Sequence, residues 1–280
     1  MPATATEARQ DLCSGSGGFC KTQTDTDPGE TMQNKVESVS SIIETSKNTE
    51  TVFWFRGHRK ASWPLLPAAF RDDVHPILEA EMAKRFKMKA QIFYRECPGG
   101  TEYQKWLPLM QHYGLPTRLL DWSESPLVAL FFAVEKSDKK EDAAIYFLDS
   151  GTMNEVLHSA PIQIILGDSP SNKINEVCER AFINKDSDVG QYPPFAVVIA
   201  QKEYRMLNQM SCFTLHDERK DLNEYAQSAR YLSKLIIPKE CIDNIRNELT
   251  ILGIRRSILF PDLTNLAEEL RRLVAISDKI

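Results

Sequence analysis

The chain has 280 residues, a formal net charge of -5 and an ordinary globular composition, with 42% hydrophobic and 26% charged residues. A chain of this length can bury a sizeable core without disulfides or structural metals. A mildly acidic protein is not a general nucleic-acid binder driven by bulk charge, although a local basic groove is compatible with this composition.

The six cysteines form no CxxC pair and no spacing typical of a zinc site, so we interpret them as free thiols in a reducing compartment and predict no metal site. The first ten residues contain no apolar run of signal-peptide length. No stretch approaches the about 20 apolar residues that a membrane span needs. The sequence therefore predicts a cytoplasmic protein with no membrane partner.

The beginning of the chain differs in composition from the rest. Residues 1–33 are rich in Thr, Ser, Gly, Gln and Asp, so we predict a flexible N-terminal segment there and one folded domain over residues 34–280. Apolar residues at helical spacing follow at 36–43, and the β-branched and aromatic run at 51–55 predicts a buried strand that ends at Arg56-Gly57. Helices are predicted over 76–97 and 103–113, the first with these residues facing inward: Ile77, Met82, Phe86, Ala90 and Phe93.

The second half of the chain mixes strands and helices. A helix start is predicted at Ser125-Pro126, because serine caps free N–H groups and proline suits the first helical position. A mixed region at 150–194 contains a predicted loop at 167–171. Strands are predicted at 143–148, 195–200, 206–215 and 232–237. Helices are predicted at 238–252, ended by Gly253, and at 264–276, with Leu266, Leu270, Leu273 and Val274 facing inward.

The order of these elements indicates a fold class. Strands and helices do not alternate regularly, which argues against a doubly wound parallel sheet. We therefore predict an α+β fold with a mixed or antiparallel β core flanked by helices.

The first candidate for chemistry is the end of the strand at 51–55, where Arg56 is followed at once by Gly57. Arginine is suited to planar, bidentate contact with phosphate or carboxylate. Glycine lets a ligand or another backbone come close. The alternative is an arginine in an internal salt bridge, followed by a turn glycine.

The second candidate is the segment 111–126, where polar and aromatic side chains crowd a short stretch before the predicted helix start. A helix N-terminus has free N–H groups and a partial positive charge, so it favours an anion. The segment also supplies hydroxyls, a charge and a ring for stacking, from Thr117, Ser123, Ser125, Arg118 and Trp122. The alternative is a well-capped helix after a Gly-Pro turn, with Arg118 and Asp121 paired structurally.

The third candidate is Gln209, inside the predicted strand at 206–215. A glutamine in a strand is commonly a hydrogen-bonding partner, and Cys212 lacks a local base, so we interpret that cysteine as core. A lone histidine such as His112 is more often packed and hydrogen-bonded than catalytic.

Together these segments resemble the FRG domain, the Phe-Arg-Gly family. The resemblance rests on Phe55-Arg56-Gly57, on residues 111–122 (Gln-His-Tyr-Gly-Leu-Pro-Thr-Arg-Leu-Leu-Asp-Trp) and on the helix that follows. Later elements at Gln209, 237–238 and 259–263 also match, so the resemblance runs from about residue 36 to about residue 272. Ser211 is a departure, because the family tends to carry glycine two residues after the glutamine, and a serine narrows the approach of a ligand.

The order of these residues is also similar to that of ADP-ribosyltransferases. In those enzymes an arginine, often followed by glycine, ends the first core strand and holds the phosphates of NAD. A second strand supplies a hydroxyl-bearing motif with a helix close behind it, and a third supplies Glu or Gln at the reacting ribose. The resemblance therefore implies an ADP-ribosyltransferase-like core that uses NAD as a substrate.

The resemblance assigns roles to named residues. Arg56 would bind the pyrophosphate or the nicotinamide ribose, and Ser123 with the helix N-terminus would support the phosphates. His112 or Thr117 would orient a ribose hydroxyl, Trp122 or Tyr113 would pack on nicotinamide, and Gln209 would orient the nucleophile or a ribose hydroxyl. The implied catalytic residues are Arg56, His112 and Gln209. The implied NAD-binding residues are Arg56, Gly57, Tyr113, Thr117, Arg118, Asp121, Trp122 and Ser123.

Three function classes follow. The first is an NAD-using ADP-ribosyltransferase-like enzyme, a bacterial toxin or defence effector that modifies nucleic acid or protein and has an antitoxin or defence partner. The absence of a catalytic glutamate would shift its targets toward nucleic-acid bases or mean no transfer at all. The second is a non-catalytic module that recognises a nucleotide, a nucleic-acid end or a phosphorylated partner through Arg56 and Arg118. The third is an NAD glycohydrolase or a nuclease, although the chain has no paired carboxylates at metal spacing and no Walker-type loop.

Overall fold

The computed structural model describes residues 35–47, 51–71, 76–167, 171–183, 190–199 and 204–277. Its contacts divide the chain into two units, Met1–Met32 and Gln33–Ile280. The predicted flexible segment 1–33 and most of the predicted loop at 167–171 lie outside the described residues. The fold below is therefore that of the second unit.

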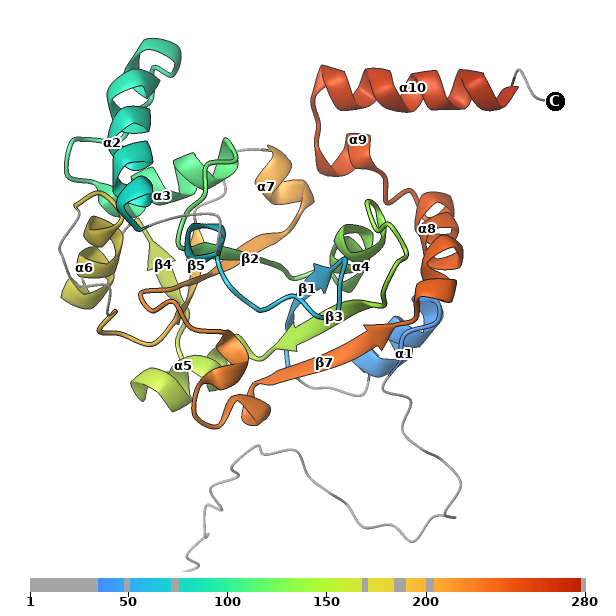
Figure 1. Ribbon diagram of the computed structural model, residues 1–280, viewed down its shortest axis with the longest axis horizontal. Helices are drawn as coiled ribbons and strands as arrows, with labels where there is room; N and C mark the ends of the chain where they lie inside the picture. Colours follow the sequence, from blue (N-terminus) through green and yellow to red (C-terminus); the bar gives the residue numbers. More distant parts are fainter. Residues whose placement is uncertain are drawn as a thin grey trace, which may run out of the picture. The chain divides into compact units, whose positions relative to one another are not determined.

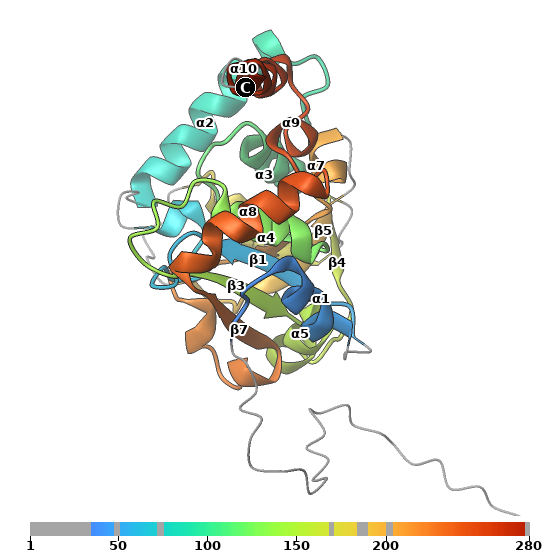
Figure 2. The same ribbon diagram turned by 90° about the vertical axis from the view of Figure 1, so that its right-hand side faces the viewer.

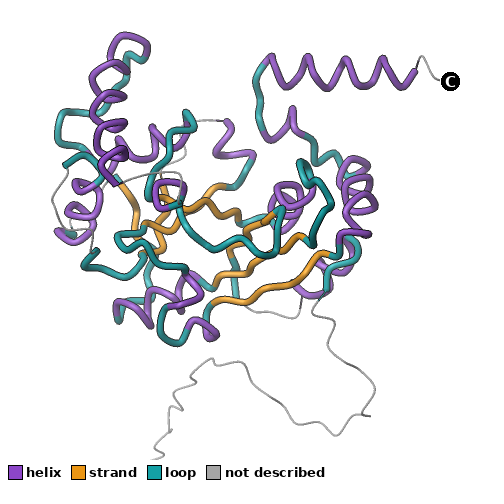
Figure 3. The backbone as a smooth tube through the Cα atoms, viewed as in Figure 1, coloured by secondary structure: helices purple, strands orange, loops and turns teal. Residues whose placement is uncertain are grey.

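A seven-stranded sheet forms the core of the described residues, in the order β4-β5-β6-β2-β1-β3-β7 (Figures 1 and 3). Only β4 and β5 pair in parallel, and the other neighbours are antiparallel. This confirms the predicted α+β class with a mixed β core. The strands are β1 (Trp54–His58), β2 (Leu119–Ser123), β3 (Ala143–Leu148), β4 (Ile164–Leu166), β5 (Phe195–Ile199), β6 (Ser211–Leu215) and β7 (Leu232–Ile237).

Helices flank this sheet. The α-helices are α1 (Val39–Lys47), α2 (Pro76–Phe93), α3 (Tyr103–His112), α4 (Pro126–Val134), α5 (Ser150–His158), α6 (Asn172–Arg180), α7 (Tyr204–Asn208), α8 (Ile242–Ile251), α9 (Arg256–Leu259) and α10 (Leu263–Ser277). Short 3-10 helices are η1 (Ala68–Phe70), η2 (Leu222–Glu224), η3 (Ser228–Arg230) and η4 (Lys239–Cys241).

Alternate strand residues pack on opposite faces of the sheet, as the pleat requires. On one face Phe55 and Ile145 pack into a cluster with α1, α4 and α8, which group in front of β1 and β3 in Figure 2. Further along the same face, Leu119 packs with residues of α3 and α6. On the opposite face Trp54 and Tyr146 pack with residues of α5 and of the segment 222–231. Helical layers on both faces explain the continuous burial of β3.

Several predicted elements agree with the structure. The strands at 143–148 and 232–237 are β3 and β7, and α4 begins at Pro126 with its N–H groups capped by Ser125. The Ser125 Oγ accepts a hydrogen bond from the Val128 N–H at 3.4 Å. Gly253 follows α8 with a φ of +79°, a backbone conformation that glycine adopts readily.

Other predictions were wrong in detail. The first strand does not end at Arg56 but continues through Gly57 to His58. The predicted strand at 206–215 is divided, because helix α7 occupies Tyr204–Asn208 and Met210 adopts a left-handed φ of 46° before β6 begins at Ser211. Strand β2 was not predicted as a strand from its own residues, and the mixed region 150–194 contains α5, β4 and α6.

The inward face predicted for α2 is largely confirmed, since Met82 and Phe86 are partly buried, whereas the face predicted for α10 is exposed to solvent. In α2, Ala90 is buried as predicted, but the side chain of Phe93 is 85% exposed. In α10, Leu270 and Val274 are 53% and 62% exposed. The polar face of α10 is the one that contacts the body, because its Asn265 accepts a hydrogen bond from Arg256 at 2.6 Å. In α10, helical periodicity identified the apolar stripe but not the side on which the helix packs.

Among the described helices, none is long and apolar enough to cross a membrane. The described cysteines, Cys97, Cys178, Cys212 and Cys241, are all free thiols. Burial raises the pKa of the Cys212 thiol well above its ordinary value, consistent with its interpretation as core. Cys13 and Cys20 lie outside the described residues.

Gly57 lets helix α4 lie directly on strand β1. A Cβ atom built at Gly57 would come within 1.9 Å of the Ala129 carbonyl oxygen and 2.7 Å of the Ala133 nitrogen. Both are backbone atoms of α4, so no side chain can move aside to make room. Two roles were predicted for Gly57, close approach of a ligand or of another backbone, and the structure shows the second.

We predict that Gly57→Ala destabilises the fold by about 3 kcal/mol or more, at the upper end of the cost of overpacking a core. The free energy of unfolding measured in urea tests this. Gly100→Ala is the matched control, since a Cβ atom there has no neighbour within 4 Å. A loss in Gly57→Ala no larger than that of the control would show that α4 can shift away from β1.

Candidate functional site

The sheet opens between β1 and β2. Their antiparallel pairing is limited to Phe55 opposite Ser123. By contrast, β1 pairs with β3 along its whole length, from Trp54 to His58. Continuing the β1–β2 register would place Gly57 opposite Asp121, yet these two residues are not paired. The backbone of β2 therefore faces an opening on this side, and the carbonyl of Asp121 needs another partner.

Arg56 supplies that partner. Its Nη1 donates to the Asp121 carbonyl oxygen at 2.5 Å, and its Nε donates to His58 Nε2 at 3.0 Å. Burial lowers the pKa of Arg56 to about 10, with a further lowering by the charge of Arg71, so the guanidinium is still charged at neutral pH. Within the described residues its Nη2 makes no hydrogen bond and can donate to a ligand.

A cleft with a volume of about 380 Å³ lies over this opening, within the usual range for small-molecule sites. Its inner wall comes from β1, β2 and the start of β6, with Arg56, Asp121, Ser123, Gln209 and Ser211. Its outer wall comes from the segment between β1 and α2, with Arg59, Trp63, Ala68 and Arg71. Ala129 and Phe132 of α4 and Arg205 of α7 complete it, so α4 presents its side rather than its N-terminal turn.

The charge of the cleft is predominantly positive. Four arginines line it, Arg56, Arg59, Arg71 and Arg205, and Asp121 is the carboxylate among the described lining residues. No described carboxylate forms a salt bridge with any of the four arginines. Because the Arg71 charge lowers the pKa of Arg56, an anion between them would relieve a repulsion.

Asp121 is held by a short chain of hydrogen bonds. Gln111 Nε2 donates to Asp121 Oδ2 at 2.8 Å, and Thr117 Oγ1 donates to Gln111 Oε1 at 2.5 Å. The hydroxyl of Thr117 also accepts from the Leu119 N–H at 3.2 Å, and its side chain is fully buried. Thr117 therefore acts on the site through Gln111, and it does not reach the cleft itself.

Ser123 and Gln209 meet on the inner wall. The Ser123 hydroxyl donates to the Gln209 carbonyl oxygen at 2.7 Å and accepts from the Ser125 N–H at 3.0 Å. The Gln209 side-chain amide donates to the Leu259 carbonyl oxygen at 2.9 Å. Ser211, the departure from the family pattern, pairs with Ser123 in the sheet and lines the same wall.

His58 is a buried and neutral support for Arg56. Because His58 Nε2 accepts the Arg56 hydrogen bond, the imidazole proton is on Nδ1. Burial lowers the pKa of His58 to about 2, and the charge of Arg56 lowers it further in the same direction. Burial likewise lowers the pKa of His216 to about 3. Both histidines are uncharged at neutral pH.

Arg118 does not reach the cleft. Its guanidinium is buried, with Nη2 at 2.7 Å from Glu79 Oε2 and Nη1 at 3.2 Å from Asp217 Oδ1. Asp217 also pairs with Arg180. The predicted ligand contact of Arg118 is therefore replaced by an internal ion-pair network, and its predicted structural partner Asp121 is replaced by Glu79 and Asp217.

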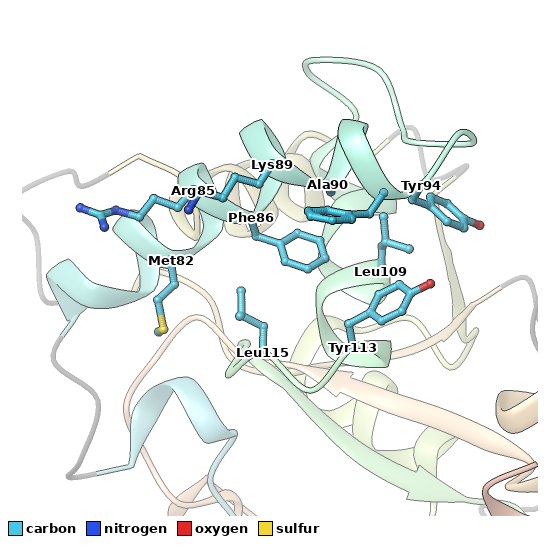
Figure 4. Close-up of a pocket in the computed structure, with 10 residues that line it drawn as sticks. Met82, Arg85, Phe86, Lys89, Ala90, Tyr94, Leu109, Tyr113 and Leu115 are labelled. Carbon is cyan, nitrogen blue, oxygen red and sulfur yellow. The ribbon is translucent and has the colours of Figure 1, made fainter. Parts of the chain in front are cut away.

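The predicted aromatic contacts are also placed elsewhere. Trp122 contributes to the cleft lining, but its side chain is only 3% exposed and its ring N–H donates to the Thr214 hydroxyl at 3.1 Å. Tyr113 lies in a separate apolar groove between α2 and α3, beside Leu109 and Tyr94 (Figure 4). Neither the Trp122 ring nor the Tyr113 ring is therefore placed to pack on a ligand in the cleft.

His112 lines yet another pocket, beside Pro108 and Met206. Its link to the cleft is through its backbone, because its carbonyl oxygen accepts from Arg205 Nη1 at 3.0 Å. The structure thus brings together Arg56, Gly57, Asp121, Ser123 and Gln209 from the predicted set. Trp122 also lines the cleft, whereas the other predicted residues lie outside it: His112, Tyr113, Thr117 and Arg118.

Four lining residues were missed from the sequence: Arg59, Trp63, Arg71 and Arg205. Arg59 and Trp63 follow the Phe-Arg-Gly tripeptide closely, and this proximity was the one signal that pointed to them. Arg71 and Arg205 reach the cleft through tertiary packing, which no local pattern reports.

Fold and cleft together define an α+β protein with a cationic cleft, opened between two strands, that is suited to a phosphate-bearing ligand. The FRG domain family model matches residues 51–142, which span β1, β2 and α4. This part of the chain is accordingly similar to the FRG-domain family. No curated protein and no solved structure matched the chain in these comparisons.

We predict that Arg118→Met lowers the free energy of unfolding by about 3–5 kcal/mol, because the buried Glu79 loses its cation and Asp217 keeps only Arg180. Arg85→Met is the control: Arg85 pairs with Glu81 at 2.6 Å on the exposed face of α2, and its loss costs about 1 kcal/mol at most. Chemical denaturation of both variants measures the difference. A stable Arg118→Met protein that lost only ligand binding would contradict the internal role.

We also predict that stability falls as the pH falls below about 6.5. The folded pKa values of His58 and His216 are depressed, so below the ordinary pKa the unfolded chain takes up protons that the folded chain does not. Each histidine then costs about 1.4 kcal/mol between pH 7.5 and pH 5.5. Urea unfolding of wild type and His58→Gln at both pH values tests this, and equal losses in the two proteins would contradict it.

Proposed function

We propose that this protein is an NAD-dependent ADP-ribosyltransferase-like enzyme. One observation supports this above the others: Arg56, Ser123 and Gln209 come from β1, β2 and the turn before β6, three strands that are neighbours in the sheet, and all line one cleft. This is the arginine, hydroxyl and glutamine order that the resemblance to ADP-ribosyltransferases implies. The site of phosphate binding in this proposal is the Arg56 guanidinium.

Arg56 is prepared for such a contact. Two of its nitrogens are fixed by the Asp121 carbonyl and by His58, so little rotamer entropy remains to be lost on binding. Its remaining Nη2 donors face a site that contains additional positive charge from Arg71. A pyrophosphate is an anion that such a planar fork recognises.

The proposed transfer breaks the bond between ribose C1′ and the nicotinamide nitrogen. The electron pair of that bond goes to nicotinamide, which leaves neutral, and the acceptor forms a new bond to C1′ and loses a proton. An oxocarbenium-like transition state is stabilised by positioned charge. Asp121, the carboxylate in the cleft lining, is the group placed to receive the proton, and Gln111 holds its orientation.

A second candidate function is a non-catalytic nucleotide-recognition module. A specific observation favours it: the group at the third strand is an amide, not a carboxylate, and Gln209 Nε2 is already bonded to the Leu259 carbonyl oxygen. An amide in that place binds a ribose hydroxyl but takes no proton. In this alternative the cleft binds the nucleotide and no bond breaks.

A toxin or defence role belongs to the same proposal. An enzyme that consumes NAD or modifies an essential macromolecule harms its own cell, so its activity requires an antitoxin or another defence partner. Nucleic acid and protein are both acceptors in this role, and the cytoplasm is the compartment that supplies NAD.

Incubation of the purified protein with NAD, with nicotinamide followed by chromatography, tests the proposal. We expect release by wild type and a loss of about 100-fold in Arg56→Ala, the usual cost of removing one oriented donor to a developing charge. Arg56→Lys keeps a charge without the planar fork and is expected to be impaired as well. Arg95→Ala, an exposed arginine between α2 and α3, is the matched control.

Thermal melts of all four proteins show whether each variant is folded. NAD binding measured by calorimetry without nicotinamide release would favour the recognition module. Neither binding nor release by folded wild type would overturn both functions.

A further inference from the structure

The proposed NAD chemistry takes only the charge of Arg71 from the outer wall of the cleft, and it assigns no role to Arg59 or Trp63. All three residues lie on the segment that connects β1 to α2. They form a second chemical surface that faces the same cleft. One short segment therefore contributes two cations and a large aromatic ring to the cleft.

Among the described residues, neither Arg59 nor Arg71 has a salt-bridge partner. Some other cations of the described chain do have a carboxylate partner, for example the half-buried Lys60 with Glu141 at 3.0 Å. Within the described part of the chain, the Arg71 guanidinium donates only to the Leu66 carbonyl oxygen, from Nε and Nη2 at 3.4 Å. Arg59 lies over the ring of Trp63, 5.1 Å from its centroid. The surface therefore presents positive charge that is not neutralised by the described part of the chain.

Trp63 provides an accessible aromatic ring in the cleft, which Trp122 and Tyr113 do not. Its side chain is half-buried, so it is held in place yet accessible to a ligand. The edge of the buried His58 ring contacts it, with a centroid separation of 6.2 Å. A fixed tryptophan with an arginine beside it is the combination that stacks an unpaired base and binds the adjoining phosphates.

We infer that the outer wall binds single-stranded nucleic acid, with one unpaired base on Trp63 and its phosphodiesters at Arg59 and Arg71. The inference rests on the proposed function in one respect: it makes this nucleic acid the acceptor, brought beside the ribose held at Arg56. A cleft of about 380 Å³ admits a nucleotide and excludes a duplex. The net charge of -5 agrees with local binding of a short strand in place of general binding to long nucleic acid.

The test is fluorescence anisotropy of a labelled single-stranded DNA of about 12 nucleotides, within the range of single-strand sites, measured without NAD at several salt concentrations. We expect Arg71→Ala to weaken binding and to reduce the slope of log affinity against log salt by about 0.7, the value for one phosphate contact on a single strand. Trp63→Ala is expected to weaken binding about tenfold with the slope unchanged, because stacking releases no counterions.

Arg95→Ala is the matched control for charge, and it should change neither the affinity nor the slope. The same strand annealed into a duplex should bind far more weakly. Equal binding of duplex and single strand, or wild-type binding by folded Trp63→Ala and Arg71→Ala, would overturn the inference. Binding of a phosphorylated peptide in place of the oligonucleotide would overturn it too.

Nicotinamide release separates this inference from the proposed function. Release by a protein that does not bind the oligonucleotide would refute the nucleic-acid site and leave the enzyme. Oligonucleotide binding that depends on Trp63 and Arg71, by a protein that releases no nicotinamide, would establish the nucleic-acid site and refute the transferase.

Discussion

The hydrogen bond from the Arg56 guanidinium to the Asp121 carbonyl, at 2.5 Å, is the contact on which the site depends. A β-sheet that parts between two central strands leaves polar backbone groups without partners, and each such group is costly when shielded from water. Here β1 and β2 are paired at Phe55 and Ser123 and then separate. Arg56 satisfies the exposed carbonyl with a side chain, so the opening persists and becomes a cleft that already contains a cation.

Gly57 completes the arrangement from the other side of the strand. Helix α4 lies so close to β1 that its backbone occupies the space of a side chain at this position. That contact fixes the side of α4, with Ala129 and Phe132, as one boundary of the cleft. The adjacent residues Arg56 and Gly57 therefore have different structural roles. The arginine holds the sheet open, and the glycine brings the helix to the edge of the opening.

Some local features could be predicted from the sequence, whereas the partners of charged residues could not. The cap at Ser125 depends on residues three positions apart, so its pattern is visible in the chain. Arg118 looked as suitable for a ligand as Arg56, but its partners Glu79 and Asp217 are 39 and 99 residues away. The same limit applies to α10, whose leucine stripe was evident while the contact of Asn265 with Arg256, which turns it outward, was not.

The position of the carboxylate separates the two functions that the cleft permits. In the order implied by the ADP-ribosyltransferases, an acidic or amide group comes from the third strand, and here that group is Gln209, bonded through its amide to Leu259. The carboxylate in the lining comes instead from the second strand, at Asp121, on the same residue whose carbonyl holds Arg56. In the proposed function, the proton acceptor and the phosphate-binding cation would thus be coupled through one residue. A ligand that displaces Arg56 would also act on the strand that carries Asp121, so ligand binding and proton transfer would not be independent in the proposed reaction.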